Sequence, residues 1–330
     1  MSVAPPLLVR QASVAIALAR QDSPALTTVQ GRAMHVLVRS TEATWTLLAL
    51  DEQLARAAPD RTVPLVTATA LVACGDRLIA AGTGPQGWLL IDGERLVPAP
   101  SRPHPVCVAG RPQVLTWEHE RLIVAELGSS LRVLHALTLE GPTPRWSAAG
   151  SGDHLVLARA GRPGPVEILR LAAGEVSTVL IPASEGATAP HLATSPGRIV
   201  VSWVAPGRLQ RVMVQPFDED LRPLQPARQV AALPEPHAVA ATFVAAGPGD
   251  ALVVSYVDRR PLDAHPGRAA GLPRAHALST WGVLLRAGHA GPPQLLVDGA
   301  EAIARWLGDE LVTLTSPPLT ATAWRPSSAP

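Results

Sequence analysis

The sequence contains no lysine and no asparagine, and apart from tryptophan its aromatic residues are only two phenylalanines and one tyrosine. All 28 residues of the lysine and arginine class are therefore arginines. Because the codons for Lys, Asn, Phe and Tyr are rich in A and T, this bias indicates a GC-rich bacterial genome rather than a functional preference for the planar guanidinium. The absence of asparagine still excludes any site that needs an Asn ligand or an Asn hydrogen-bond donor.

A strong excess of one charge is also missing, because 28 basic residues face 27 acidic ones and the net charge is +1. Dedicated nucleic-acid-binding proteins usually carry a marked basic excess. The charge balance therefore predicts no nucleic-acid partner.

The chain has only two cysteines, Cys74 and Cys107. Two are too few for a disulfide framework or a tetrahedral zinc site. Because both lie in apolar, strand-like runs, we expect them to be buried free thiols.

Long hydrophobic runs are absent, and no stretch approaches the 18 or so apolar residues that a membrane-spanning helix needs. The longest apolar run near the N-terminus, residues 14–19, is short for a signal peptide, and no basic segment precedes it. We therefore expect no membrane contact and a cytoplasmic location. The 34 prolines and 26 glycines indicate many turns, whereas 47% apolar residues are too many for a disordered chain.

What the sequence does contain is a repeat. The stretch GDRLIAAG at Gly75 returns as GDHLVLAR at Gly152, GDALVVSY at Gly249 and GDELVTLT at Gly308. Each match combines a glycine turn with a following strand-like run. With three weaker matches, the anchor glycines are Gly31, Gly75, Gly110, Gly152, Gly197, Gly249 and Gly308.

The spacing of the anchors is typical of propeller blades, which have four strands in each repeat of about 40–50 residues. The intervals range from 35 residues between Gly75 and Gly110 to 59 between Gly249 and Gly308. The shortest interval ends at the weakest match, GRPQ at Gly110. If that anchor is spurious, the number of blades is six instead of seven.

The second unit illustrates the four expected strands, ATALVACG, RLIAAGT, GWLLIDG and ERLVPAP, with an Asp-Gly hairpin turn between the last two. A tryptophan recurs in the expected third strand of four units. A large aromatic side chain at one repeated position is expected to fill the gap between neighbouring blades. These residues are Trp45, Trp88, Trp281 and Trp324.

The two ends of the chain complement each other. The seventh unit has three expected strands, and residues 7–19 form a strand-like segment without a partner of its own. If that segment completes the last blade, the ring closes and no sheet edge stays open. The segments LDEQLARAA and AEAIARWLG have a helical composition, but their place in the repeat predicts turn and strand.

On these features the whole chain, residues 1–330, resembles a single-domain, all-β, seven-bladed β-propeller. The resemblance is to an architecture and not to a functional family, because Trp-Asp repeats, kelch double glycines and the sialidase-type box are all missing. Fold alone does not imply function.

The sixth unit departs from the others between its second and third strands. Residues 258–279 form an insertion of some 20 residues where the other units use short turns. In propellers generally, ligands and partners favour the face that such turns share with the connections between blades. Arginine forks suit carboxylates, phosphates or an acidic protein patch, although a solvated loop without a role is the alternative. The candidate binding residues are Arg259, Arg260, Asp263, His265, Arg268, Arg274 and His276.

Chemical motifs are absent elsewhere. There is no HxH or HExxH, no GxSxG and no P-loop, and the glycine-rich GTGPQG at Gly82 precedes a strand and not the N-terminus of a helix. We therefore predict no catalytic residue, no metal and no cofactor. The sequence favours a non-catalytic propeller that serves a protein partner as an interaction or scaffold subunit. The alternative is a small-molecule binder or enzyme with a site that the 258–279 loop forms at the mouth of the central channel.

Overall fold

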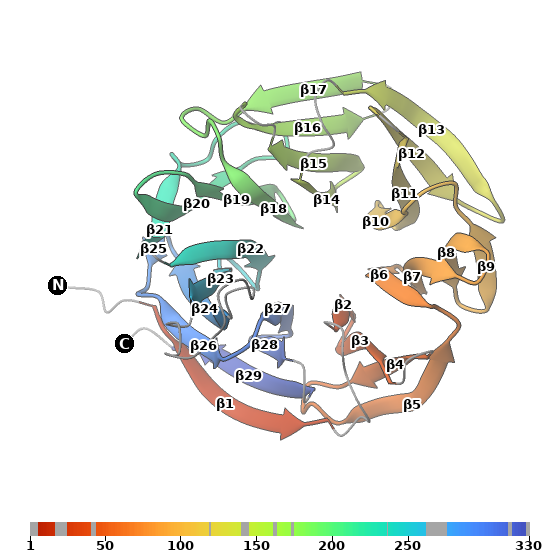
Figure 1. The fold of residues 1–330 in the computed structure, drawn as a ribbon, viewed down its shortest axis with the longest axis horizontal. Coiled ribbons are helices and arrows are strands. Elements are labelled where there is room, and N and C mark those ends of the chain that lie inside the picture. The colour runs from red at the N-terminus through yellow and green to blue at the C-terminus, as the bar shows by residue number, and fades with distance from the viewer. Residues whose placement is uncertain are drawn as a thin grey trace, which may run out of the picture.

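The chain folds into seven small antiparallel sheets that stand as blades around a central axis (Figure 1). The computed structural model describes residues 6–16, 25–40, 44–118, 120–139, 145–160, 164–172, 175–235, 237–261, 276–315 and 319–327, without the side chains of Pro261 and His276. All regular structure in these ranges is strand, so they hold no helix that could cross a membrane.

We number the blades along the chain and give their strands from the axis outward. Blade 1 consists of β2 (Leu26–Gln30), β3 (Ala33–Arg39), β4 (Trp45–Leu50) and β5 (Arg56–Val63). Blade 2 consists of β6 (Thr67–Cys74), β7 (Arg77–Gly84), β8 (Gly87–Asp92) and β9 (Arg95–Pro98). Blade 3 consists of β10 (His104–Val108), β11 (Arg111–Glu118), β12 (Arg121–Leu127) and β13 (Leu131–Thr138).

Blade 4 consists of β14 (Arg145–Ser151), β15 (His154–Ala160), β16 (Val166–Ala172) and β17 (Glu175–Leu180). Blade 5 consists of β18 (Thr188–Ser195), β19 (Arg198–Ala205), β20 (Leu209–Phe217) and β21 (Arg228–Pro234). Blade 6 consists of β22 (Ala238–Ala246), β23 (Leu252–Pro261), β24 (His276–Arg286) and an outer strand in two pieces, β25 (His289–Ala290) and β26 (Gln294–Asp298).

Blade 7 joins the two ends of the chain. It consists of β27 (Ala302–Leu307), β28 (Glu310–Thr315), β29 (Thr320–Pro326) and, outermost, β1 (Leu8–Ala15). β1 pairs antiparallel with β29 from Leu8 opposite Pro326 to Ala15 opposite Thr320. The predicted seven blades and the predicted closure by the N-terminal strand are both confirmed, and the six-bladed alternative is wrong.

The seven anchor glycines all lie in the turn between the first and second strands of a blade. Their φ angles fall between +57° and +72°, a left-handed conformation that glycine adopts without a Cβ penalty. The two helix-like segments are turn and strand, as predicted. LDEQLARAA forms the turn before β5 and the start of that strand, and AEAIARWLG contains β27.

The core is divided among the seven interfaces between neighbouring blades. Each interface holds its own cluster of buried apolar side chains, such as the one that Leu37, Trp45 and Val63 of blade 1 form with Leu71 and Ile91 of blade 2. Blades are therefore apolar on both faces. Of the four third-strand tryptophans, Trp45, Trp281 and Trp324 pack in such interfaces as predicted, while Trp88 is half-buried.

Arginines on outer strands fasten blades to their neighbours. Arg61, Arg95 and Arg228 each donate to the carbonyl of a turn glycine in the next blade, at 3.5, 3.1 and 2.5 Å. The acceptors are Gly93, Gly128 and Gly288, all between the third and fourth strands. These three arginines therefore have a structural role.

The expectation of free thiols is wrong, because Cys74 and Cys107 form a disulfide. Cys74 ends β6 and Cys107 lies in β10, so the bond joins the innermost strands of blades 2 and 3. The packing of these two strands brings the Cα atoms to 5.1 Å, within the range that a disulfide requires. Sequence spacing alone could not show that residues 33 apart become neighbours.

Candidate functional site in blade 6

The second and third strands of blade 6 form the long hairpin in which the sequence placed the insertion. β23 and β24 have 10 and 11 residues and pair continuously from Leu252 opposite Leu285 to Pro261 opposite His276. Both ends of the predicted insertion, 258–279, are therefore strand. Residues 258–261 and 276–279 continue the two strands, because each position finds a partner on the opposite strand.

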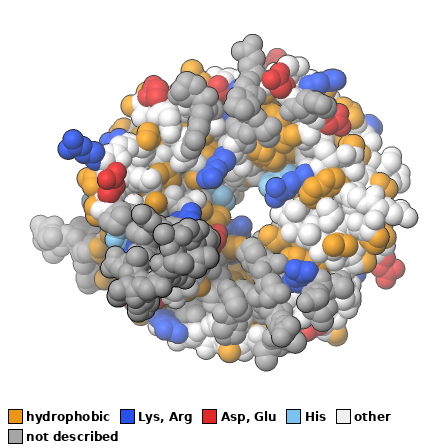
Figure 2. All heavy atoms as spheres, in the orientation of Figure 1, with side chains coloured by type: hydrophobic (Ala, Val, Ile, Leu, Met, Phe, Trp, Pro, Cys, Tyr) orange, Lys and Arg blue, Asp and Glu red, His pale blue; other side chains and the backbone are white. Residues whose placement is uncertain are grey.

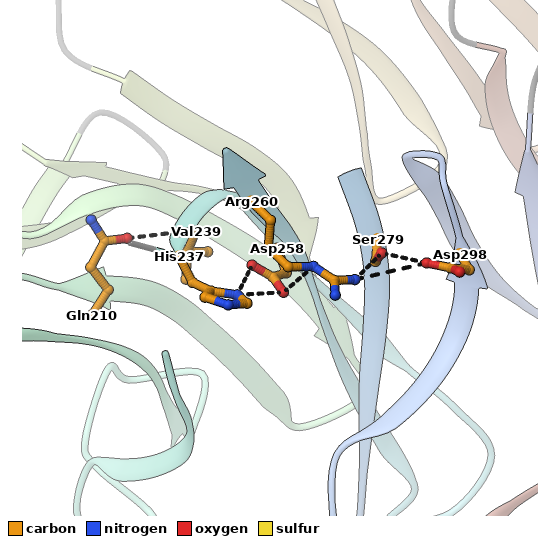
Figure 3. Close-up of polar contacts among 7 residues, drawn as sticks. All are labelled: Gln210, His237, Val239, Asp258, Arg260, Ser279 and Asp298. Atoms are coloured by element: carbon orange, nitrogen blue, oxygen red, sulfur yellow. Dashed lines mark hydrogen bonds and ion pairs between the residues drawn. The ribbon is translucent and has the colours of Figure 1, made fainter. Parts of the chain in front are cut away.

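A chain of polar contacts crosses this hairpin, and we call it the blade-6 polar cluster (Figure 3). Its members come from three places in blade 6, namely the connection that enters the blade, the hairpin, and the end of the outer strand. They are His237, Asp258, Arg260, Ser279 and Asp298.

Asp258 is the centre of the cluster. Residues 256, 258 and 260 share one face of β23, because side chains alternate along a strand. Both carboxylate oxygens of Asp258 lie near Nδ1 of His237, at 3.0 and 3.1 Å, and one lies 3.4 Å from Nε of Arg260. Only 5% of Asp258 is exposed, so its charge needs these partners to offset desolvation.

The contacts continue through Arg260 to the outer strand. Nη2 of Arg260 donates to the hydroxyl of Ser279 at 2.8 Å, and that hydroxyl donates to Asp298 at 2.8 Å. Ser279 is fully buried. Since His237 precedes β22 and Asp298 ends β26, the cluster ties the hairpin to both connections between blade 6 and its neighbours.

The entry to the blade is fixed by a further bond in the same view. The N–H of Val239, near the start of β22, donates to Oε1 of Gln210 in blade 5 at 2.7 Å (Figure 3).

Burial and, to a smaller degree, the negative charge of Asp258 raise the pKa of Tyr256 to about 12. Tyr256 therefore stays neutral and adds no charge to the cluster.

Chemically, the cluster supplies a histidine held by a buried carboxylate, with its side chain one-third exposed. That is the base half of a nucleophilic triad. The serine that could complete it does not do so, because the Ser279 hydroxyl is engaged by Arg260 and Asp298. Within the described ranges no three His, Cys, Asp or Glu residues are grouped as a metal site would need.

The predicted binding residues have different places. Arg260 belongs to the cluster, and Arg259 is exposed on the opposite face of β23. His276 opens β24, but its side chain is not described. Asp263, His265, Arg268 and Arg274 lie outside the described residues.

Sequence reasoning missed His237 and Asp298, which lie far from the insertion in the chain. A signal for both existed, because they fall in or beside the connections between blades, which reach the same face as the hairpin. The separation of two residues between Asp258 and Arg260 was a signal too, since it puts both side chains on one face of a strand.

Comparison with known proteins gives the fold alone. No protein-family model and no curated protein matches the chain. Among solved structures it is similar to BBS1N in complex with ARL6DN, at 11% identity and a TM-score of 0.52, over 98% of this chain and 97% of that one. It is also similar to a prolyl endopeptidase, at 12% identity and a TM-score of 0.55, over 88% of this chain but only 46% of that one. The hydrazine synthase of Kuenenia stuttgartiensis gives 14% identity and a TM-score of 0.51, over 72% and 70%.

Proposed function

We propose that this propeller is a non-catalytic interaction subunit that binds a protein partner through the hairpin of blade 6. The observation that carries the proposal is the blade-6 polar cluster, which fixes the base of this hairpin from both sides. A docking element gains affinity when its base is held rigid before binding, because less conformational entropy is then lost.

The charge of the hairpin indicates an acidic partner surface. Arg260 offsets the negative charge of Asp258 within the cluster, and Arg259 is exposed on the other face of the strand. A guanidinium binds carboxylates in a bidentate manner, which suits an acidic patch. BBS1N, a structure of similar extent, forms a complex with another protein, so a chain of this size and shape is large enough for such a role.

The test uses a tagged full-length chain and two variants in pull-downs from the native host. In the first variant, residues 262–275 are replaced by a short Gly-Ser linker, which keeps the strand pairs and the cluster. The second is Arg259→Glu, with Arg208→Glu as a control, because Arg208 is exposed in the corresponding turn of blade 5. We expect a stoichiometric partner that is lost in both variants and retained in the control. Equal recovery of the partner by all four proteins would refute the proposal.

The pair of His237 and Asp258 favours a second candidate function, that of a small-molecule enzyme with His237 as general base. A histidine oriented through Nδ1 by a buried carboxylate keeps Nε2 for proton transfer. In this case His237→Gln would abolish turnover of a substrate found by screening esters, lactones and amides, while leaving the fold intact. No turnover of any compound by the unmodified protein would count against this candidate.

A further inference from the structure

The innermost strands of the seven blades surround the central axis of the ring, and all seven are described (Figure 1). None of them contains an aspartate or a glutamate. Figure 2 shows the molecule hollowed at its centre, with arginine and histidine side chains around the opening. The charged or titratable residues of these strands are His104, Arg145, His191 and Arg305, apart from the disulfide cysteines.

Arg305, in β27 of blade 7, differs from three other partly buried arginines. Arg77, Arg159 and Arg170 each face a carboxylate of Asp92, Glu167 or Asp220. Arg305 makes one hydrogen bond, from Nη1 to the carbonyl of Ala304 at 3.0 Å, and no ion pair with any described residue. A guanidinium has five N–H donors, so most of those on Arg305 lack an acceptor in the described part of the chain.

Two electrostatic effects agree that the charge of Arg305 is not compensated. Burial lowers the pKa of Arg305, with no opposing contribution from an acid. The nearest carboxyl in sequence, Glu301, forms no ion pair with Arg305, and burial raises its pKa. Glu301 is therefore not the partner of Arg305.

Two histidines approach the same space from other blades. Nδ1 of His191, in β18 of blade 5, accepts a hydrogen bond from the N–H of Val244 at 3.1 Å. The neutral ring therefore carries its hydrogen on Nε2, and this Nε2–H can donate a hydrogen bond. Burial lowers the pKa of His191 to about 3, and the charges of Arg305 and then His104 contribute to the shift. These residues of blades 3, 5 and 7 therefore lie within electrostatic reach of one another.

We propose that the central channel binds the carboxylate of a small organic acid, held by the guanidinium of Arg305 and the Nε2–H of His191. Since both histidines are neutral near pH 7, the positive charge near them comes from arginines, namely Arg305 and Arg102, whose charge acts on His104. The ring of Phe243 lies 5.3 Å from that of His191, and the ring of Trp146 lies 4.6 Å from that of His104. These rings provide an apolar wall for the body of the acid. The site is separate from the blade-6 polar cluster and does not depend on the proposed partner.

Isothermal titration calorimetry with benzoate tests the proposal, with inorganic phosphate as the competing oxyanion and chloride as background salt. We expect saturable binding of benzoate at one site per chain, weakened about tenfold or more in Arg305→Gln because a charge-assisted pair is lost. The matched control is Arg145→Gln, an exposed arginine at the end of another innermost strand, which should bind as the unmodified chain does.

A second measurement needs no variant, in case Arg305→Gln fails to fold. The imidazole resonances of His191 in the unmodified chain should shift on addition of benzoate, with the same dissociation constant as in calorimetry. Absence of binding at millimolar benzoate, unshifted His191 resonances or equal binding by a folded Arg305→Gln chain would overturn the site. Tighter binding of phosphate than of benzoate would overturn the choice of a carboxylate.

Discussion

Among the residues that the structure describes, Asp258 is the only buried one with a charged side chain. A carboxylate taken out of water is stable only when charges and donors surround it. Here His237 and Arg260 supply them, and Arg260 relays the contact to Ser279 and Asp298. The stability of the hairpin therefore depends on this one side chain.

We expect Asp258→Asn to lower the free energy of unfolding by about 2–4 kcal/mol, because it leaves the guanidinium of Arg260 without its buried counter-charge. The control is Asp298→Asn, whose side chain is 75% exposed and whose loss should cost about 1 kcal/mol or less. Urea denaturation of both variants measures the difference. An equal loss of unfolding free energy in the two variants would show that the burial of Asp258 does not increase its contribution to stability.

The histidines of the innermost strands make stability depend on pH. Burial lowers the pKa of His104 to about 4 and that of His191 to about 3, from 6.5 in the unfolded chain. Below pH 6.5 the unfolded chain therefore binds protons that the folded chain does not. The stabilising effect is complete above pH 6.5 and decreases as the pH falls toward 4.

We expect the free energy of unfolding to fall between pH 7 and pH 5, by up to about 1.4 kcal/mol per pH unit for each of the two rings below 6.5. In His191→Gln, which keeps an acceptor for Val244, the part of the slope that these two rings cause should be about half as large. His35, whose pKa burial also lowers, keeps its contribution in the variant. Denaturant titrations at several pH values measure it. An unchanged slope in the variant would exclude His191 as a source.

Among the elements, β6 and β10 are linked by the disulfide as well as by packing. For a loop of 33 residues, the chain-entropy model gives a stabilisation of about 3–4 kcal/mol. Disulfides persist mainly in oxidising compartments. The bond therefore argues against a cytoplasmic location, which stays a prediction.

We expect the purified chain, unfolded without reductant, to resist alkylation at both cysteines. The double variant Cys74→Ser and Cys107→Ser should lose stability by the amount above, whereas adding dithiothreitol to it should change nothing more. Mass spectrometry after iodoacetamide treatment and urea denaturation check the two statements. Full alkylation of the unreduced chain would mean that the thiols are free after all.

The elements themselves could be predicted because glycine turns and apolar runs are local signals, repeated in every blade. Even the helix-like segment of β27 was assigned correctly, since the repeat outweighed its local propensity. The site could not be predicted as well. The contact of His237 with Asp258 joins the connection that enters blade 6 to the hairpin, and the charge of Arg305 acts on His191 of another blade. The pattern that the repeats share contains neither interaction.

At the scale of the whole molecule, the ring depends on one strand from the other end of the chain. Leu8 is buried, its N–H donates to Gln294 at 2.7 Å and its carbonyl accepts from the same side chain at 3.0 Å. The N–H of Ile16 donates to Leu319 at 2.8 Å at the other end of β1. Without these contacts the edge of β29 would offer unpaired backbone groups to other chains.

We expect a chain without residues 1–16 to melt at a lower temperature and to form oligomers, because β29 becomes an open edge. A peptide of residues 6–16, added in trans, should restore the melting temperature in proportion to its concentration, since it binds only the folded ring. A peptide of the same composition in scrambled order is the control. Differential scanning calorimetry and light scattering follow the two effects. A truncated chain that stays monomeric and melts as the full chain does would show that seven blades hold together by their apolar interfaces alone.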